Sequence, residues 1–149
     1  MPPASEQLTA AIIGCGDIAG GYDAHTDGSS VLSHAGAYRA DGRIQVVACV
    51  EPDPTRRQAF MKKWDIPSGF DTLDDCLQET GALDVASVCS PTHTHEAALT
   101  RLLDSSVRIV FCEKPMTGDP ARSEHLHEAY NAAGKKICVN YLRRWDSEM

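Results

Sequence analysis

The stretch Leu8-Thr-Ala-Ala-Ile-Ile-Gly14-Cys15-Gly16-Asp17-Ile18-Ala19-Gly20 decides how this chain folds. Its first six residues are a short, mostly apolar run with β-branched side chains, which is typical of a strand buried in a parallel sheet. Small residues follow at the spacing G-x-G-x-x-A. This spacing allows a tight turn, a close approach of the backbone to a pyrophosphate, and close packing of a helix on the strand. We therefore expect a dinucleotide to bind at residues 14–18.

Apolar runs and helix-forming segments alternate along the rest of the chain, which is the pattern of a parallel sheet wound on both faces. The sequence predicts an α/β fold: one Rossmann-type, doubly wound parallel sheet of about six strands, in three αβα layers, over residues 1–149. The further strands are expected at 44–50, near 70, and at 84–89, 107–112 and 136–140. Helices are expected at 31–40, from 54 onward, and at 72–79, 97–103 and 120–133.

The segment at residues 20–30 is rich in glycine and polar residues and cannot continue a regular helix. We expect it to interrupt the first helix and to form a loop over the phosphate site.

Composition excludes several classes of function. The formal net charge of −7 argues against nucleic acid as a partner, because phosphates call for basic surfaces. No apolar run approaches the roughly 20 residues that a membrane span needs. The first residues lack the basic and apolar regions of a signal peptide. A cytoplasmic protein with no membrane partner is expected.

The six cysteines do not have the spacing of a metal site. Cys49, Cys89, Cys112 and Cys138 lie in apolar, strand-like runs, where a free cysteine behaves as a small hydrophobic residue. No C-x-x-C pair occurs, so neither a metal nor disulfides are expected. Cys15 is the one thiol that a helix N-terminus could activate, although a space-filling role is the simpler interpretation.

Glu51 ends the second predicted strand and is the expected acceptor for the adenosine ribose hydroxyls. It lies farther from the glycine motif than is usual, and the 20–30 segment accounts for the difference. A carboxylate here repels a 2′-phosphate, so NAD is predicted in preference to NADP. Arg56 and Arg57 follow closely and weigh against that preference.

Polar residues also follow the fourth and fifth predicted strands, at the edge where open α/β sheets bind ligands. Ser90, Pro91 and Thr92 begin one such turn, and Glu113-Lys114-Pro115 forms the other. A lysine at this edge can donate to a substrate hydroxyl or carbonyl, and partial desolvation would lower its pKa towards catalytic use. The alternative is a Glu–Lys pair in solvent. His93 and His95 lack a third ligand for a metal.

Taken together, these motifs resemble the N-terminal domain of the Gfo/Idh/MocA family of glucose-fructose oxidoreductases and inositol dehydrogenases. The resemblance covers nearly the whole chain, and Glu113-Lys114-Pro115 is its most specific part. It implies that Lys114 contacts the substrate hydroxyl near the nicotinamide and that Glu113 lines the cofactor pocket. It further implies that Ser90, Pro91, Thr92 and His95 flank the pyrophosphate and the nicotinamide ribose, and that the Lys114–Pro115 peptide bond is cis.

The family also has a second α/β domain, which carries the substrate pocket and an Asp…His catalytic pair, and nothing in residues 1–149 supplies it. Residues 141–149 would begin the connection to that domain. We therefore expect the cofactor-binding half of an oxidoreductase that acts on sugar-like or cyclitol-like alcohols, inactive alone, with any homo-oligomer formed through the second domain. A non-catalytic NAD-binding sensor and a different Rossmann enzyme, such as an amino-acid pathway dehydrogenase, are the alternatives.

Overall fold

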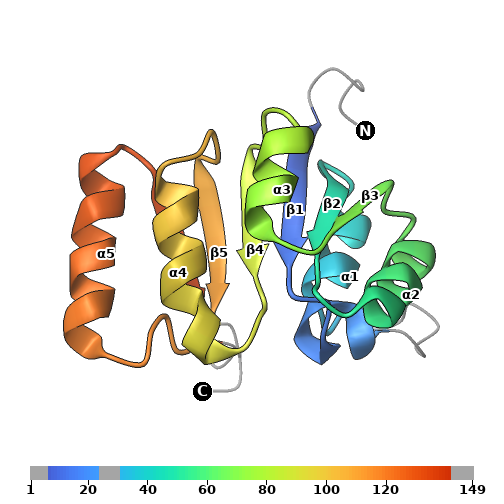
Figure 1. Cartoon of the computed structure of the whole chain (residues 1–149), viewed down its shortest axis with the longest axis horizontal. Coiled ribbons are helices and arrows are strands. Elements are labelled where there is room, and N and C mark those ends of the chain that lie inside the picture. Colours follow the sequence, from blue (N-terminus) through green and yellow to red (C-terminus); the bar gives the residue numbers. More distant parts are fainter. Residues whose placement is uncertain (1–6, 24–30, 142–149) are drawn as a thin grey trace.

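Six parallel strands form one sheet in the order β3-β2-β1-β4-β5-β6 (Figure 1). The computed structural model describes residues 7–23 and 31–141. The strand order is that of the doubly wound dinucleotide-binding fold. The chain adds β2 and β3 on one side of β1, and then adds β4, β5 and β6 on the other side. The strands are β1 (Leu8–Ile13), β2 (Ile44–Val50), β3 (Ser68–Phe70), β4 (Val85–Val88), β5 (Ile109–Glu113) and β6 (Lys136–Asn140).

Helices cover both faces of the sheet, as the sequence predicts. Helices α3, α4 and α5 pack on one face, in front of the sheet in Figure 1, over the larger apolar core. Helices α1 and α2 and the short turn η2 cover the β3-β2-β1 half of the other face over a smaller core. The helices are η2 (Asp17–Gly21), α1 (His34–Asp41), α2 (Pro54–Trp64), α3 (Leu73–Glu79), α4 (Thr92–Leu103) and α5 (Pro120–Ala132). Across residues 7–23 and 31–141, no helix has the length and apolar content to cross a bilayer.

The first helix is interrupted, as predicted. After the glycine motif the chain makes a single wide turn, η2, in which Gly21 donates to the Gly16 carbonyl at 3.3 Å. Helix α1 then begins only at His34. Residues 24–30 of the predicted loop lie outside the described part of the chain.

The two described ends of that interruption are joined by one side chain. The buried Asp23 carboxylate accepts hydrogen bonds from the Leu32 N–H at 2.9 and 3.1 Å and from the Ser33 hydroxyl at 2.5 Å. Ser33 in turn caps α1 by accepting from the Gly36 N–H. The prediction that this helix starts at Val31 is therefore wrong: the cap sets its start at His34, and Val31 is exposed.

Helix α4 begins at Thr92, five residues before the predicted start at Ala97. Pro91 immediately precedes it with φ of −59°, a backbone value that suits entry into a helix, and its missing N–H is not needed there. The polar residues that indicate a turn in the sequence instead form the first turns of the helix.

All six cysteines carry free thiols. Five are buried, and for Cys49, Cys89 and Cys112 this agrees with the apolar runs in which they lie. The interpretation of Cys138 as a buried residue is wrong, because β6 is an edge strand and the Cys138 side chain is exposed.

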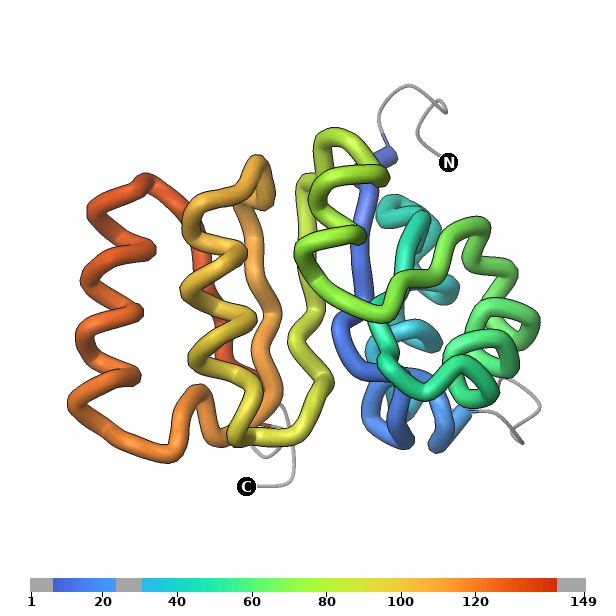
Figure 2. The backbone as a smooth tube through the Cα atoms, in the orientation of Figure 1, coloured from blue at the N-terminus to red at the C-terminus, as the bar shows by residue number. Residues whose placement is uncertain are grey.

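The backbone of Gly14 lies directly against the turn that follows β4. Gly14 has a φ of +88°, and a Cβ atom built on it would fall 2.6 Å from both the N and Cα atoms of Ser90. Figure 2 shows the two turns side by side at the lower edge of the sheet. Only glycine meets both demands, one conformational and one steric. Gly16 differs, because nothing lies within 4 Å of its added Cβ and its φ is −83°.

We therefore predict that Gly14→Ala lowers the free energy of unfolding by about 1–3 kcal/mol, because the new methyl group collides with backbone rather than with a movable side chain. The matched variant Gly16→Ala should stay within about 0.5 kcal/mol of the parent chain. Urea unfolding followed by circular dichroism measures both, and equal stabilities for the two variants would contradict this account of Gly14.

Candidate dinucleotide site

Two turns meet at the carboxyl edge of the sheet, between β1 and β4, where the strand order reverses. The glycine turn follows β1 and is tied to β2 because Gly14 donates to the Val50 carbonyl at 2.8 Å. The turn after β4 is tied to β1 because Cys89 donates to the Ile13 carbonyl at 2.7 Å. This arrangement fixes both turns to the sheet and leaves a crevice between them, where ligands bind in open α/β sheets.

Glu51 is the acidic residue of this crevice. Its buried carboxylate accepts from the Cys15 N–H at 3.1 Å and, through its other oxygen, from the Asp53 N–H at 3.1 Å. The first of these bonds places the carboxylate against the glycine turn, although 36 residues separate the two partners. Within the described residues, the N–H groups of Gly16 and Asp17 have no hydrogen-bond acceptor.

The two arginines after Glu51 have different surroundings. Arg57 is largely covered and binds both the Asp71 carboxylate and the Glu51 carbonyl oxygen. Arg56 is more than half exposed and lies 3.7 Å from the nearer Glu51 carboxylate oxygen. Arg57 is therefore occupied by the protein itself, and Arg56 alone is placed to approach a ligand near Glu51.

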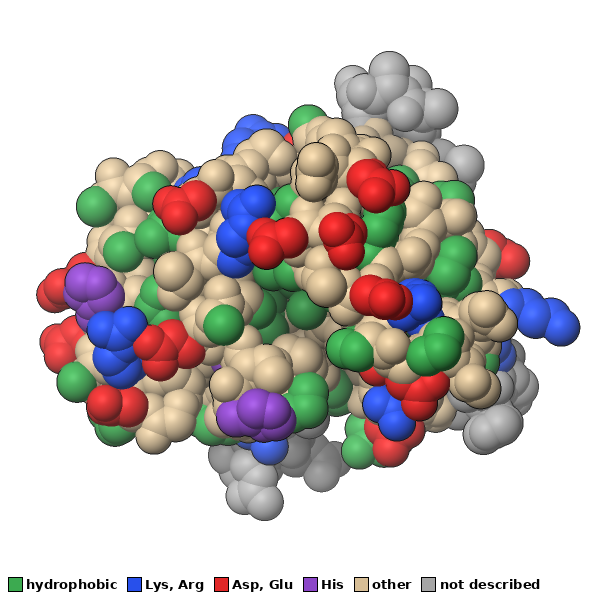
Figure 3. Space-filling view, in the orientation of Figure 1, with side chains coloured by type: hydrophobic (Ala, Val, Ile, Leu, Met, Phe, Trp, Pro, Cys, Tyr) green, Lys and Arg blue, Asp and Glu red, His purple; other side chains and the backbone are tan. Residues whose placement is uncertain are grey.

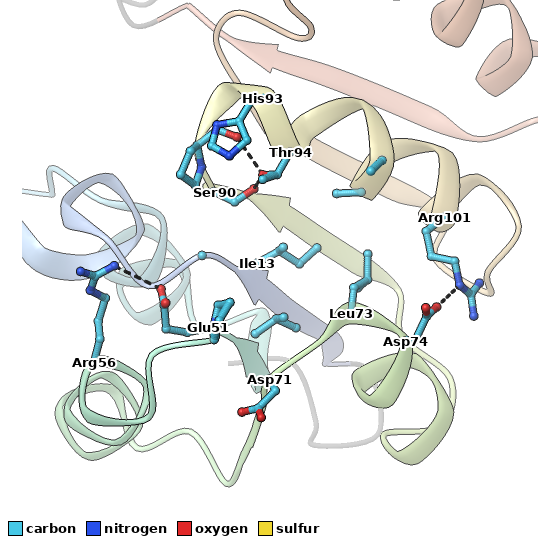
Figure 4. Close-up of a pocket in the computed structure, with 16 residues that line it drawn as sticks. Ile13, Glu51, Arg56, Asp71, Leu73, Asp74, Ser90, His93, Thr94 and Arg101 are labelled. Carbon is cyan, nitrogen blue, oxygen red and sulfur yellow. Dashed lines mark hydrogen bonds and ion pairs between the residues drawn. The ribbon is translucent and has the colours of Figure 1, made fainter.

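A pocket of about 550 Å³ opens between these segments. Figure 3 shows it as a recess with hydrophobic side chains inside and charged side chains around it, and Figure 4 shows its labelled residues in place. One end lies at Glu51 and Arg56, and the other at the Arg101–Asp74 ion pair between α4 and α3. The lining residues are Ile13, Gly14, Val50, Glu51, Pro52, Arg56, Asp71, Leu73, Asp74, Ser90, Pro91, His93, Thr94, Ala97, Ala98 and Arg101.

A second hollow of about 600 Å³ lies beside η2 and α2, and Cys15, Gly16, Asp17 and Arg56 belong to its lining. The glycine turn and Arg56 therefore separate two open spaces. A hydrogen bond from the Cys15 thiol to Cys49, together with burial, raises the pKa of the Cys15 thiol. This direction favours a neutral, space-filling thiol over a reactive thiolate.

His95 is buried beneath the crevice rather than exposed within it. One ring nitrogen lies 2.7 Å from the Ser90 carbonyl oxygen and the other lies 2.9 Å from that of Pro115. The His95 ring thus lies between the turn after β4 and the turn after β5, within hydrogen-bonding distance of a carbonyl oxygen of each. Its exposed neighbour, His93, reaches the pocket rim.

The Glu113-Lys114-Pro115 turn contains a cis peptide bond between Lys114 and Pro115, as the family resemblance implies. The Lys114 side chain is exposed. The Glu113 carboxylate is buried and turned inward, with one oxygen 2.8 Å from His34 Nε2 and 2.7 Å from Asn140 Nδ2. Glu113 and Lys114 do not line the 550 Å³ pocket.

The structure thus gathers part of the predicted set at one pocket: Gly14, Glu51, Ser90 and Pro91 line it, and the Cys15 N–H adjoins it. Ile18 packs partly into the smaller core, and Thr92 begins α4. The expected ligand contacts of Gly14, Cys15, Gly16, Asp17, Ile18, Glu51, Ser90, Pro91, Thr92, His95, Glu113 and Lys114 remain predictions.

Sequence reasoning missed the far wall of the pocket and the partner of Glu113. The wall residues Leu73, Asp74, Thr94 and Ala97 lie in the first turns of α3 and α4, and their position after a strand and a turn is a usable signal. For His34, the signal is a polar residue in an otherwise apolar strand, because Ser87 in β4 is its second partner.

This fold and this crevice define a dinucleotide-binding Rossmann domain. Residues 8–141 match the GFO_IDH_MocA family, described as an oxidoreductase family with an NAD-binding Rossmann fold, and the chain belongs to it.

Two inositol 2-dehydrogenases are similar to the chain. Inositol 2-dehydrogenase 1 of Paenarthrobacter aurescens is 31% identical over 105 residues, which are 70% of this chain and 31% of that protein. Inositol 2-dehydrogenase of an Arthrobacter species is 30% identical over 146 residues, which are 97% of this chain and 39% of that protein. The chain therefore matches only about a third of the length of these relatives.

Solved structures share the fold at lower identity. The WlbA dehydrogenase of Bordetella pertussis, crystallised with NADH and UDP-GlcNAcA, has a TM-score of 0.79 at 22% identity and covers 95% of this chain and 39% of its own. The 3-ketoreductase KijD10 of Actinomadura kijaniata, crystallised with TDP-benzene and NADP, has a TM-score of 0.74 at 22% identity and covers 90% of this chain and 37% of its own.

The buried Glu113 carboxylate predicts a dependence of stability on pH. Burial raises the pKa of Glu113, but hydrogen bonds from His34 and Asn140 outweigh burial, and the pKa lies below its ordinary value. A carboxyl group with a lower pKa in the folded state stabilises the fold above its unfolded pKa of about 4.3, and this contribution is lost as the pH falls through the folded value. The free energy of unfolding should therefore fall below about pH 4.3, and less steeply in Glu113→Gln.

Urea unfolding at a series of pH values measures this difference. Glu128→Gln, an exposed change on α5, is the matched control and should follow the parent chain. The same pH dependence in the parent chain and in Glu113→Gln would show that Glu113 does not carry the effect.

Proposed function

We propose that this chain is the cofactor-binding half of a nicotinamide-dependent oxidoreductase that acts on hydroxyl groups of sugar-like or cyclitol-like substrates. The observation that carries the proposal is the convergence of the glycine turn, the Glu51 carboxylate and the turn after β4 on one pocket. Residues of this chain would bind and orient the dinucleotide, which supplies the hydride acceptor when bound.

The open space at the glycine turn fits the dinucleotide's pyrophosphate. An added Cβ at Gly16 meets nothing within 4 Å, and the neighbouring N–H groups of Gly16 and Asp17 have no acceptor among the described residues. A phosphate oxygen is a suitable acceptor for such groups. The apolar wall beyond, which includes Ile13, Val50 and Leu73, suits the flat adenine ring.

Glu51 supports NAD as the cofactor in preference to NADP. Both of its oxygens already hold backbone N–H groups, so the carboxylate is fixed where the adenosine ribose would lie. Fixed negative charge there accepts hydrogen bonds from ribose hydroxyls and opposes a 2′-phosphate. Because Arg57 is engaged with Asp71, Arg56 alone could offset that repulsion.

The proposed substrate class rests on the named relatives, which are inositol 2-dehydrogenases. In this proposal Lys114 is the catalytic residue: its exposed side chain directly follows the buried and fixed Glu113 in the chain, and its amine could bind a substrate hydroxyl. A sensor that only binds NAD would have no use for a lysine at this position, which favours the enzyme over that alternative.

Calorimetric titration tests the cofactor site. The parent chain should bind NADH about tenfold more tightly than NADPH, and Glu51→Ala should narrow that ratio because the fixed charge is gone. Gly16→Ala should weaken NADH binding about tenfold without loss of fold, because its methyl group enters the phosphate space.

Glu128→Ala, an exposed change on α5, is the control and should leave both affinities unchanged. Equal affinity for the two cofactors in the parent chain would overturn the assignment of Glu51. Unchanged NADH affinity in Gly16→Ala would overturn the proposed phosphate site.

Residues 1–149 alone should show no steady NADH production with any polyol in a panel, because holding reactants together contributes about 7–11 kcal/mol to such reactions and this segment holds only one of them. The matched measurement extends the chain by a family second domain. Activity should then appear and should be lost in Lys114→Ala while NADH still binds. Steady turnover by residues 1–149 would overturn the half-enzyme proposal.

A further inference from the structure

A buried polar group lies beneath the Glu113-Lys114-Pro115 turn, on the face of the sheet covered by α1. Its centre is His34, the first residue of α1, which is 4% exposed. Nε2 of His34 lies 2.8 Å from Glu113 Oε1, and Nδ1 lies 2.9 Å from Ser87 Oγ. The Tyr38 hydroxyl lies 2.6 Å from the same Ser87 oxygen. These four residues come from three elements and form a continuous chain of hydrogen bonds.

The hydrogen bonds have a defined direction. The ionised Glu113 carboxylate can only accept, so the Nε2 atom of His34 carries the proton that bonds to it. In the neutral ring Nδ1 then accepts from the Ser87 hydroxyl, whose oxygen accepts from Tyr38. Burial raises the pKa of Tyr38 to about 12, so the phenol keeps its proton and remains a donor. Every member has a partner, and no buried side-chain nitrogen or oxygen in the described residues lacks one.

Packing alone does not explain this arrangement. Burying a polar group costs free energy unless it is hydrogen-bonded, and apolar residues of similar volume often stabilise a core at least as well. The buried polar residues here are Ser87, His34, Glu113 and Asn140. His34 and Asn140 both bond to the same carboxylate oxygen of Glu113. The ring of His34 also packs on Phe111 at a centroid distance of 4.9 Å, which fixes its plane.

The Glu113 carboxylate belongs to the residue that directly precedes Lys114, the proposed catalytic residue. The backbone N–H of Lys114 also acts on Glu113, with His34 and Asn140, to lower its pKa against the effect of burial. Donors from α1 and β6 thus hold the residue immediately before Lys114. The geometry points to His34 as a positioning residue that sets the place and charge environment of Lys114 through Glu113; this inference rests on the proposed role of Lys114.

Removing the imidazole should disturb Lys114 in a specific way. Without the His34 donor, the Glu113 carboxylate loses one of its two side-chain hydrogen bonds and can turn from the core towards solvent, where the Lys114 side chain is exposed. A carboxylate that turns outward would favour the charged form of Lys114, so in His34→Phe the midpoint of the Lys114 titration should rise relative to the parent chain by about 0.5 pH or more. NADH affinity should fall by about fivefold, equal to about 1 kcal/mol, because the turn is no longer held in place.

Nuclear magnetic resonance of the chain labelled with [ε-13C]lysine measures both effects, with the Lys114 signal assigned by its loss in Lys114→Met. We expect the largest change in His34→Phe, a smaller one in Ser87→Ala and the smallest in Tyr38→Phe, because the latter two lie progressively farther from Glu113. His34→Gln should restore most of the parent behaviour, because its amide can donate to Glu113. His125→Gln, an exposed histidine on α5, is the matched control.

A merely structural role would lower the unfolding temperature of His34→Phe and leave the Lys114 titration of the folded chain unchanged, and that outcome would overturn the inference. If His34→Phe does not fold, the Lys114 titration and the NADH affinity of His34→Gln and Ser87→Ala test the inference instead. If the Lys114 resonance of the parent chain does not change when NADH is added, the proposed function is wrong. The titration of Lys114 without NADH still decides the role of His34.

Discussion

The contact between two backbones at Gly14 is the constraint on which the rest of the site depends. A side chain at this position would need the space of Ser90, and the backbone would leave its φ of +88°. Because the turns after β1 and β4 touch there, the crevice between them has a fixed floor. The Glu51 carboxylate then closes one side through the Cys15 N–H. The shape of the pocket therefore depends on the absence of a side chain at Gly14.

Polar groups at this edge of the sheet serve two different purposes. Glu51 and Ser90 line the pocket, where a ligand would contact them. His95 and Glu113 face inward and bind neighbouring turns and strands. In the proposed function the first group would contact the ligand, while the second keeps the turns in place. This division explains why ionisable residues at the ends of buried strands are not all candidates for ligand contact.

Much of the fold could be predicted because strands buried on both faces leave a strong local pattern, as in Leu8–Ile13 and Val85–Val88. The starts of α1 and α4 could not, since the first depends on the Ser33 cap and the second on how Pro91 enters the helix. The inward turn of Glu113 was also hidden. Its partner His34 is 79 residues away, and no periodicity records a hydrogen bond across that distance.

The hydrogen bonds of Asp23 to Leu32 and Ser33, which clamp the two ends of residues 24–30 together, affect how this domain can change over evolution. Asp23 is bonded to Leu32 and Ser33, so the last residue before residues 24–30 is held beside the first residues after them. Lengthening a chain segment whose ends are already joined costs little conformational entropy, about 0.6 kcal/mol for each doubling of its length. Insertions or deletions between the clamped ends would leave the register of α1 unchanged. The segment is thus a site where new sequence can be accepted without altering the sheet.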